Sequence, residues 1–211
     1  MRVDPASVQA HISPSARVAE STIVKGCGTL TIDDFGVIED HVLIDLGKSG
    51  QGVVRLGLRT KLKYGAVLRC YNGRIEIGSR TTVGEYTVIA AHGGVTIGSD
   101  VGIAGHCTIA ASNHIRVLSE TPIRYQGETA KGIQIGNGVW IATGVRVLDG
   151  VCVNDGAAVG AGAVVNRSLP PRHLCVGVPC RPVRELDPLH AHLADIDTPH
   201  TADIDEDIPY N

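Results

Sequence analysis

Aromatic residues are scarce in this chain. Phe, Tyr and Trp make up only 3% of its 211 residues, and a single Phe, Trp and Met stand against 26 Gly. A core without large rings has to be built from Val, Ile, Leu and Ala, and the 43% hydrophobic content is sufficient for one. This composition favours thin, uniform layers over an irregular globular core, and it does not indicate a disordered chain.

A strong charge bias and long apolar runs are also missing. The formal net charge is −3, so the chain lacks the excess of clustered Lys and Arg that binds nucleic acid or an anionic membrane. No apolar stretch approaches the length of a membrane span, and the N-terminal residues MRVDPASVQAHISPSA do not resemble a signal peptide. We therefore expect a cytoplasmic protein with no membrane span and no nucleic-acid partner.

The cysteines indicate neither a metal site nor a disulfide framework. They are scattered, without a CxxC pair or zinc-finger spacing: Cys27, Cys70, Cys107, Cys152, Cys175 and Cys180. Free cysteine behaves as a small hydrophobe, so we expect buried thiols. His190, His192 and His200 lack a folded context, and no bound metal is expected there or elsewhere.

What the sequence does contain is a six-residue repeat. From residue 135 it reads IGNGVW, IATGVR, VLDGVC, VNDGAA, VGAGAV and VNRSLP, with a branched aliphatic residue at each sixth position: Ile135, Ile141, Val147, Val153, Val159 and Val165. The same ladder recurs upstream in four runs: Ile12, Val18, Val24, Leu30; Leu56, Leu62, Leu68; Ile77, Val83, Ile89; and Ile97, Ile103, Ile109, Ile115. A period of six fits neither a helix nor simple alternation, but it suits a short strand followed by a turn.

Three such sides close one triangular coil, and stacked coils form parallel sheets. Gly, Asn and Asp between the aliphatic positions supply the tight corners, because they tolerate positive φ or bond their own backbone. The sequence therefore predicts an all-β parallel β-helix over residues 1–185, whose stability is a sum over neighbouring layers. An acidic tail, 186–211, is expected to be largely disordered.

The ladder is interrupted at four places. These are GKSGQG at 47–52, CYNGR at 70–74, two extra residues around 91–94, and one extended loop over about 116–134. Irregular segments on a rigid scaffold carry binding groups, so function is expected at these interruptions.

Residues 97–185 also carry an ordered set of motifs. A His at the end of a coil is followed by a loop, IGNGVWI, two further coils and GVPCRPVRE. Together these resemble the hexapeptide-repeat acyltransferases, specifically the sugar O-acetyltransferases related to galactoside and maltose acetyltransferases and to polysaccharide-modifying enzymes. The resemblance implies a left-handed β-helix, an exception to the usual right-handed crossover. It also implies an acetyl-CoA-dependent enzyme, a sugar or polysaccharide-precursor acceptor, and a homotrimer with active sites between adjacent prisms.

The resemblance assigns the chemistry to two residues. The family's catalytic histidine stands just before the loop, where this chain has His114 in AASNHIRVLSETPIRYQGETAKGIQIG. Imidazole can take the proton of a sugar hydroxyl as the hydroxyl attacks the thioester. The resulting oxyanion needs a donor, and the backbone N–H of Thr143, shortly after Trp140, matches the family's oxyanion hole.

Other residues are assigned to the two substrates. The resemblance places CoA along Trp140, Ala161, Gly162, Asn166, Arg167, Arg181 and Arg184, where small residues admit the pantetheine arm and arginines meet phosphates. The acceptor is expected near Asn113, Gly84 and His92. Because Gly84 and His92 stand where galactoside acetyltransferases carry Asn and Asp, the identity of the sugar stays open.

Three alternatives remain. The nearest is an N-acetyltransferase acting on an amino sugar or a nucleotide-linked amino sugar. Because the repeat begins near residue 12, we do not expect the N-terminal nucleotide-sugar domain that some of those enzymes have. A γ-type carbonic anhydrase would hold zinc with three histidines, and His92, His106 and His114 are the candidates here. Their spacing differs from that of the paired zinc ligands in that family. A structural solenoid such as an ice-binding protein would carry regular Thr-x-Thr arrays, which the sequence lacks.

Overall fold

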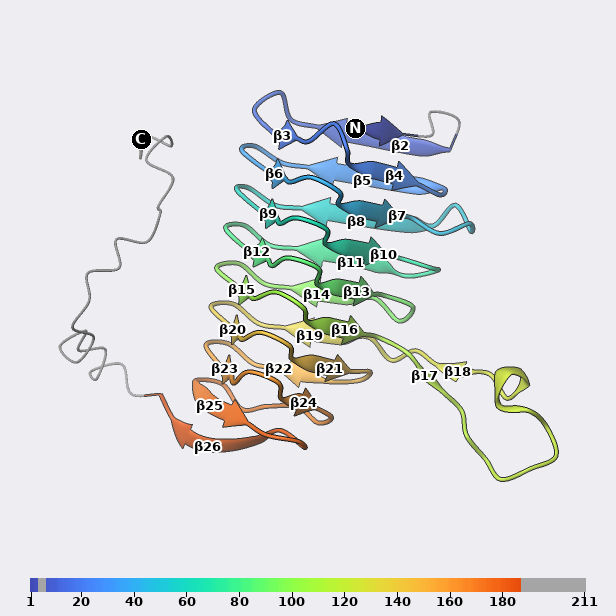
Figure 1. The fold of residues 1–211 in the computed structure, drawn as a ribbon, viewed down its shortest axis with the longest axis vertical. Coiled ribbons are helices and arrows are strands. Elements are labelled where there is room, and N and C mark those ends of the chain that lie inside the picture. Colours follow the sequence, from blue (N-terminus) through green and yellow to red (C-terminus); the bar gives the residue numbers. More distant parts are fainter. Residues whose placement is uncertain (4–6, 187–211) are drawn as a thin grey trace.

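The described residues of the computed structural model, 1–3 and 7–186, form a three-sided prism of stacked coils (Figure 1). Successive strands visit three sheets in turn, and neighbours within these sheets are parallel except for the last pair. The one helical segment in the described part is a short 3-10 turn, η1 (Ile123–Tyr125). This architecture matches a left-handed parallel β-helix and confirms the predicted fold class.

The three sheets are named here A, B and C. Sheet A contains β1 (Arg2–Val3), β4 (Ile23–Lys25), β7 (Leu43–Asp45), β10 (Val67–Arg69), β13 (Val88–Ala90), β16 (Thr108–Ala110), β21 (Arg146–Leu148) and β24 (Val164–Val165). Sheet B contains β2 (Val8–Ile12), β5 (Gly28–Ile32), β8 (Gly52–Leu56), β11 (Arg74–Ile77), β14 (Val95–Ile97), β19 (Ile133–Ile135) and β22 (Cys152–Val153). Sheet C contains β3 (Arg17–Val18), β6 (Val37–Ile38), β9 (Lys61–Leu62), β12 (Thr82–Val83), β15 (Gly102–Ile103), β20 (Trp140–Ile141), β23 (Ala158–Val159), β25 (His173–Val176) and β26 (Arg181–Glu185).

The edges of the prism are named by the sheets that they join. The chain runs from sheet A to B to C within each coil, so it turns at an A–B edge, a B–C edge and a C–A edge. A separate antiparallel pair, β17 (Asn113–His114) and β18 (Glu128–Thr129), stands outside the three sheets.

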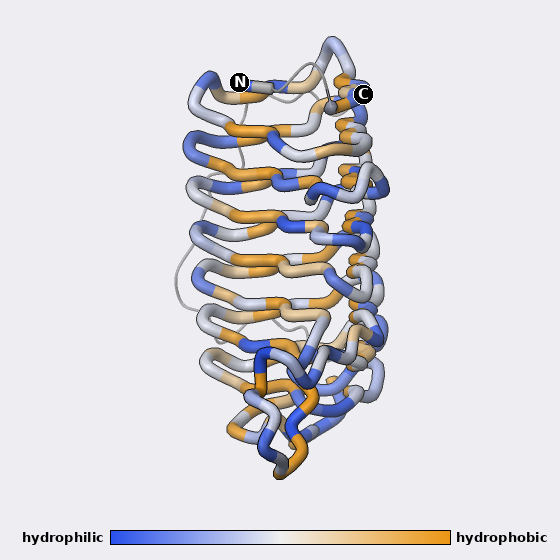
Figure 2. Tube along the Cα trace, turned by 90° about the vertical axis from the view of Figure 1, so that its right-hand side faces the viewer, coloured by the Kyte–Doolittle hydropathy of each residue, from blue (hydrophilic) through white to orange (hydrophobic). Residues whose placement is uncertain are grey.

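The inward positions of the six-residue ladder form the core. Leu68, for example, lies in register with Ile44 and Ile89, and all three are almost completely buried. Figure 2 shows the same alternation, with apolar segments recurring along the strands of successive coils. Burial of each such side chain contributes about 1.5–3 kcal/mol.

Two details of the sequence prediction are wrong. Ile115 keeps the six-residue spacing but is exposed, because the chain leaves the coil after the buried Ala111. Cys27 and Cys152 are only half-buried, whereas the other four thiols are buried as expected. Cys152 precedes the inward Val153 on β22 and therefore points outward.

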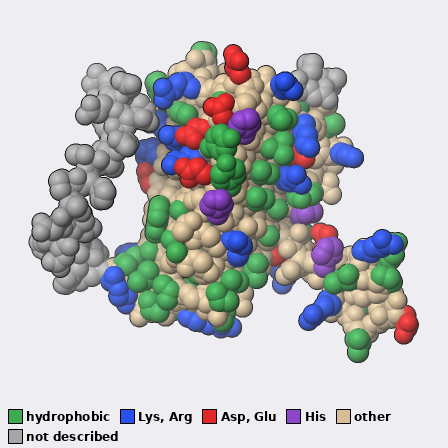
Figure 3. Space-filling model, in the orientation of Figure 1, with side chains coloured by type: hydrophobic (Ala, Val, Ile, Leu, Met, Phe, Trp, Pro, Cys, Tyr) green, Lys and Arg blue, Asp and Glu red, His purple; other side chains and the backbone are tan. Residues whose placement is uncertain are grey.

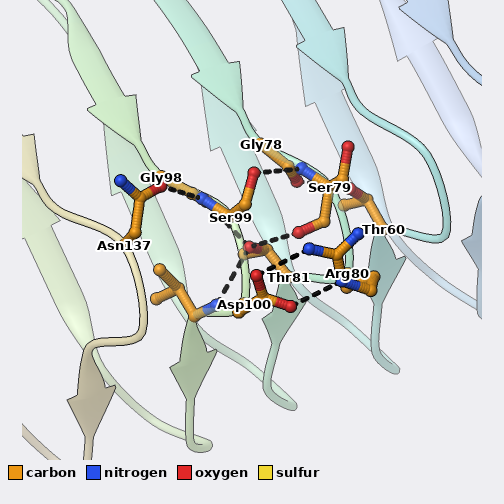
Figure 4. Close-up of polar contacts among 10 residues, drawn as sticks. Thr60, Gly78, Ser79, Arg80, Thr81, Gly98, Ser99, Asp100 and Asn137 are labelled. Carbon is orange, nitrogen blue, oxygen red and sulfur yellow. Dashed lines mark hydrogen bonds and ion pairs between the residues drawn. The ribbon is translucent and has the colours of Figure 1, made fainter. Parts of the chain in front are cut away.

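The B–C edge is held by polar contacts between adjacent coils (Figure 4). The Ser79 N–H donates to Ser99 Oγ at 3.1 Å, and the Ser99 N–H donates to Asn137 Oδ1 at 2.8 Å. Arg80 makes a two-fold contact with Asp100, Nε to Oδ1 at 2.6 Å and Nη2 to Oδ2 at 2.7 Å. The polar groups of this edge thus support the stack of coils.

An antiparallel pair ends the stack at its C-terminal side. Strand β26 pairs with β25 at the end of sheet C, and the Leu186 N–H donates to the carbonyl of Arg172. The expected acidic tail lies outside the described residues from residue 187 onward. Among the described residues, no helix has the length and apolar character required to cross a bilayer.

Candidate active site

All four interruptions of the ladder lie on the A–B edge. They connect β7 to β8, β10 to β11, β13 to β14 and β16 to β19, so the topology stacks them along one side of the prism (Figure 1). The longest, residues 112–132, is called the arm. The sequence predicts this loop over about 116–134, but the last buried residue before it is Ala111 and the next is Ile133. His114 therefore lies on the arm itself.

Backbone pairing fixes the base of the arm. Strands β17 and β18 run antiparallel with His114 opposite Glu128. On the return side, the carboxylate of Asp149 accepts hydrogen bonds from the backbone N–H groups of Lys131 at 2.9 Å and Gly132 at 3.0 Å. Both strands of the arm are thus tied close to the prism.

The tip of the arm is apolar and exposed. The Gln126 side chain holds the turn together by accepting from the Val117 N–H at 2.8 Å and donating to the Thr121 carbonyl at 2.7 Å. Leu118 and Tyr125, by contrast, are largely exposed. Figure 3 shows the arm standing away from the prism with several hydrophobic side chains on its surface. Exposed apolar groups of this kind mark contact surfaces.

A carboxylate lies between two histidines at the base of the arm. Glu128 Oε1 is 3.6 Å from His114 Nε2, and Glu128 Oε2 is 3.8 Å from His92 Nε2. His92 Nδ1 lies 3.2 Å from Ser112 Oγ, and the ring of Tyr71 stacks on His92 with 3.6 Å between centroids. The structure therefore brings together the predicted His114 and His92, with the predicted Asn113 beside His114 on β17.

Sequence reasoning missed Glu128, Ser112 and Tyr71. The sequence offers one weak signal for them, since Tyr71 and Glu128 lie in the interruptions at 70–74 and about 116–134, and Ser112 stands two residues before His114. The contact of Glu128 with both histidines depends on the pairing of β17 with β18, which no local pattern indicates.

The predicted oxyanion donor lies on the C–A edge. Thr143 follows β20, and its hydroxyl donates to the Gly105 carbonyl of the previous coil at 2.9 Å. Within the described part of the chain, the backbone N–H of Thr143 has no acceptor. Its carbonyl accepts from the Gly162 N–H at 2.9 Å, so Thr143, Ala161 and Gly162 stack on one edge. A Cβ at Gly162 would have no heavy atom within 4 Å, so the edge is open there.

Trp140 forms an apolar surface next to this edge. It points outward from β20, is 52% exposed, and pairs in register with Gly102 and Ala158. A Cβ at Gly102 would lie 2.6 Å from Cε3 of the indole, so a glycine at this position lets the ring lie against sheet C.

Four aromatic side chains form a column along the same C–A edge (Figure 3). Ring centroids are 5.2, 5.5 and 5.3 Å apart in the sequence His41, Tyr64, Tyr86 and His106. Beside them, hydrogen bonds from its own backbone N–H and from Lys63 hold the pKa of the Glu85 carboxyl below its usual value. Gly84, a predicted acceptor residue, precedes Glu85 and is buried. A Cβ there would lie 2.4 Å from the Ala104 carbonyl carbon, so the position has no space for a side chain.

The remaining predicted CoA residues lie at the C-terminal end of the prism. Arg181 Nη1 donates to Asn166 Oδ1 at 3.3 Å, which links β26 to the segment after β24. Arg167 follows Asn166 and is exposed, as is Arg184 on β26. These residues form a group of their own.

Sheet A separates the two main groups within one chain. His114 and His92 belong to the A–B edge, whereas Thr143 and Trp140 belong to the C–A edge and sheet C. No cluster of three or more His, Cys, Asp or Glu side chains suited to a metal ion occurs among residues 1–3 and 7–186.

Comparison with known proteins gives structural relatives. No family model and no curated protein matches the sequence. A hexapeptide-repeat acetyltransferase from Vibrio cholerae, solved with acetyl-CoA, is 27% identical with a TM-score of 0.58, over 63% of this chain and 71% of that one. A galactoside acetyltransferase solved with CoA is 30% identical with a TM-score of 0.56, over 64% of this chain and 65% of that one.

A longer match is more distant in sequence. A variant of AntD, an N-acyltransferase from Bacillus cereus, was solved with CoA and dTDP-4-amino-4,6-dideoxyglucose; it is 16% identical with a TM-score of 0.57, over 84% of each chain. At this identity the match shows the fold alone. The predicted resemblance is confirmed: the structures that this chain resembles are hexapeptide-repeat acyltransferases, and they support an acyltransferase.

Proposed function

We propose that this protein transfers the acetyl group of acetyl-CoA to a hydroxyl of a sugar or polysaccharide precursor in the cytoplasm. The observation that carries the proposal is the contact of His114 with Glu128 at the base of the arm. A hydroxyl is a weak nucleophile at neutral pH, so its acylation needs a base held in place.

His114 is the general base and Glu128 positions it. The carboxylate faces Nε2, which favours the tautomer with the proton on that nitrogen and leaves Nδ1 to accept a proton. As the sugar oxygen attacks the thioester carbonyl, its proton passes to Nδ1. When the tetrahedral intermediate breaks the C–S bond, the imidazolium returns this proton to the CoA sulfur, giving an acetyl ester and free CoA.

The donor for the oxyanion comes from a second copy. The unpaired N–H of Thr143 suits this task, but it lies on the C–A edge, away from His114. A homotrimer that packs the A–B edge of one copy beside the C–A edge of the next joins both groups. The exposed tip of the arm and the aromatic column support such a contact.

Acetyl-CoA, as a substrate, runs along the C–A edge toward the C-terminal end. Trp140 gives the pantetheine arm an apolar surface, and Gly162 leaves the edge free of side chains. The guanidinium groups of Arg167, Arg181 and Arg184 meet the phosphates of the nucleotide. Arg167 and Arg184 are exposed and Arg181 is half-buried, and such a set of groups near the end of the prism fits the nucleotide end of an extended ligand.

The test measures thiol release from acetyl-CoA with matched hydroxyl and amino sugars. We expect hydroxyl sugars to be acetylated, and His114→Ala to lower kcat at least about a hundredfold, with CoA binding and the mass of the trimer unchanged. His11→Ala, an exposed histidine on β2, is the matched control. Unchanged turnover in His114→Ala overturns the mechanism, and turnover of amino sugars alone favours N-acetylation.

A further inference from the structure

A cleft of about 920 Å3 opens on the A–B edge beside His92. Its walls come from the interruptions at 70–74 and 91–94, the base of the arm, and strands β11, β14, β19 and β22 of sheet B. Arg74, Lys131 and Gln134 contribute side chains. Of the described residues that line the cleft, none is acidic.

Glycine backbone forms the part of the cleft nearest the arm. A Cβ at Gly93 would lie 2.5 Å from the Gly132 nitrogen, and a Cβ at Gly132 would lie 2.6 Å from the Gly93 oxygen. Side chains at these positions would push the arm away from the 91–94 corner. Their absence lets the backbone of the arm lie directly against the prism.

Two positive side chains border this space. Arg74 enters from β11 and makes one long contact, Nη1 to Glu76 Oε1 at 3.6 Å, with most of its side chain exposed. The Lys131 side chain passes over Gly150, and within the described residues its ammonium group makes no ion pair. Asp149 accepts from the backbone N–H of Lys131 and makes no ion pair with its ammonium group.

The cleft also approaches the proposed base through His92. His92 lines the cleft, and its Nε2 lies 3.8 Å from the carboxylate of Glu128. The other oxygen of that carboxylate faces His114 at 3.6 Å. A ligand held by Arg74 and Lys131 therefore lies beside His92, and the carboxylate of Glu128 links His92 to His114.

We propose that this cleft binds an oxyanion carried by the acceptor, so that the acceptor is an acidic sugar. Arg74 offers the planar fork that pairs with a carboxylate or a phosphate, and Lys131 adds a second positive charge. A neutral sugar would leave Lys131 without an ion pair among the described residues and Arg74 with only its long contact to Glu76. This inference rests on the proposed function for its reaction, but the binding itself can be measured without turnover.

The test compares three probes on the full chain: a hexuronic acid, a hexose 6-phosphate and the neutral hexose. Binding is followed by calorimetry and ligand-observed NMR. We expect at least one anionic sugar to bind about tenfold or more tightly than the neutral hexose, and the advantage to disappear in R74Q/K131Q. Comparing the carboxylate with the phosphate identifies which oxyanion is bound. R2Q/R17Q removes two exposed charges from β1 and β3, outside the cleft, and is the matched control.

Binding of CoA in the same samples separates the two proposals. Equal or absent binding of both anionic sugars, with CoA still bound, overturns the acidic-sugar inference and leaves the transferase intact. An anionic preference that survives in R74Q/K131Q overturns the inference as well. Loss of the preference in that variant, in a protein that does not bind CoA, supports the cleft and overturns the transferase.

Discussion

Replacing Glu128 by Gln removes the charge beside His114 and preserves the size of the side chain. At the 3.6 Å between Glu128 Oε1 and His114 Nε2, a pair of charges is worth about 1 kcal/mol in water and about 5 kcal/mol at the effective dielectric of a protein surface. The two side chains are 38% and 57% exposed, so screening by solvent keeps the energy near the lower value.

An energy of about 1 kcal/mol corresponds to about fivefold in rate. Loss of the contact that orients the ring adds to this, so we expect kcat to fall about tenfold in Glu128→Gln. The KM for acetyl-CoA should stay the same, because the groups that we propose to bind CoA, among them Trp140 and Gly162, do not include Glu128. The assay measures kcat and KM by thiol release across pH, since a change in the pH profile separates an effect on the base from a loss of structure.

A matched variant and an independent probe make this prediction refutable. Glu120→Gln removes a carboxylate from the same arm that makes no ion pair in the described structure, and it should leave kcat unchanged. Hydrogen exchange across residues 112–132 reports whether the arm stays folded. If Glu128→Gln keeps the kcat and pH profile of the parent while His114→Ala is inactive, then His114 acts without Glu128.

Two further predictions concern the core and the arm. Burial raises the pKa of the Cys70 thiol to about 12, so it should resist alkylation at pH 8 until the chain is unfolded; labelling at equal rates in native and denatured protein contradicts this. Because the unfolded thiol ionises near pH 8.5, the stability that the neutral thiol contributes should be lost as pH rises from about 9 toward 12, which denaturant titrations can follow. Asp149→Ala removes the acceptor of two backbone N–H groups. The free energy of local opening at Lys131 and Gly132 should fall by about 1–3 kcal/mol, so their amide hydrogens should exchange faster while the prism stays protected. Unchanged exchange at both amides means that the arm is held by other contacts.

The coils could be predicted because each one depends on local spacing. An inward residue such as Leu68 needs only its neighbours in the adjacent coils, which carry the same pattern at Ile44 and Ile89. Ile115 shows the limit of this reasoning. It continues the spacing of Ile109, but the pattern alone does not reveal that Ala111 is the last residue of the coil.

The contacts of the candidate site could be predicted only in part. A motif identified His114, and a break in the ladder drew attention to His92, yet the carboxylate between them was missed. Glu128 reaches both histidines because β18 returns antiparallel to β17, and the register of that pair depends on the fold of the whole arm. The contact of Tyr71 with His92 likewise crosses from one coil to the next.

The division of the site between two edges follows from how the coil closes. The hydroxyl of Thr60 donates to the carbonyl of Gly78 in the next coil, 18 residues away. The hydroxyl of Thr143 donates to the carbonyl of Gly105 in the previous coil, 38 residues away, because the arm lies between them. The arm therefore lengthens one coil without changing the order of the edges. The arm leaves and returns at the A–B edge, and Asp149 ties its return strand there. While β17 and β18 stay paired, His114 is kept on that side, and sheet A lies between it and the N–H of Thr143. A single chain therefore places the proposed base and the proposed oxyanion donor on two different edges, and the proposed reaction needs a second copy to bring them together.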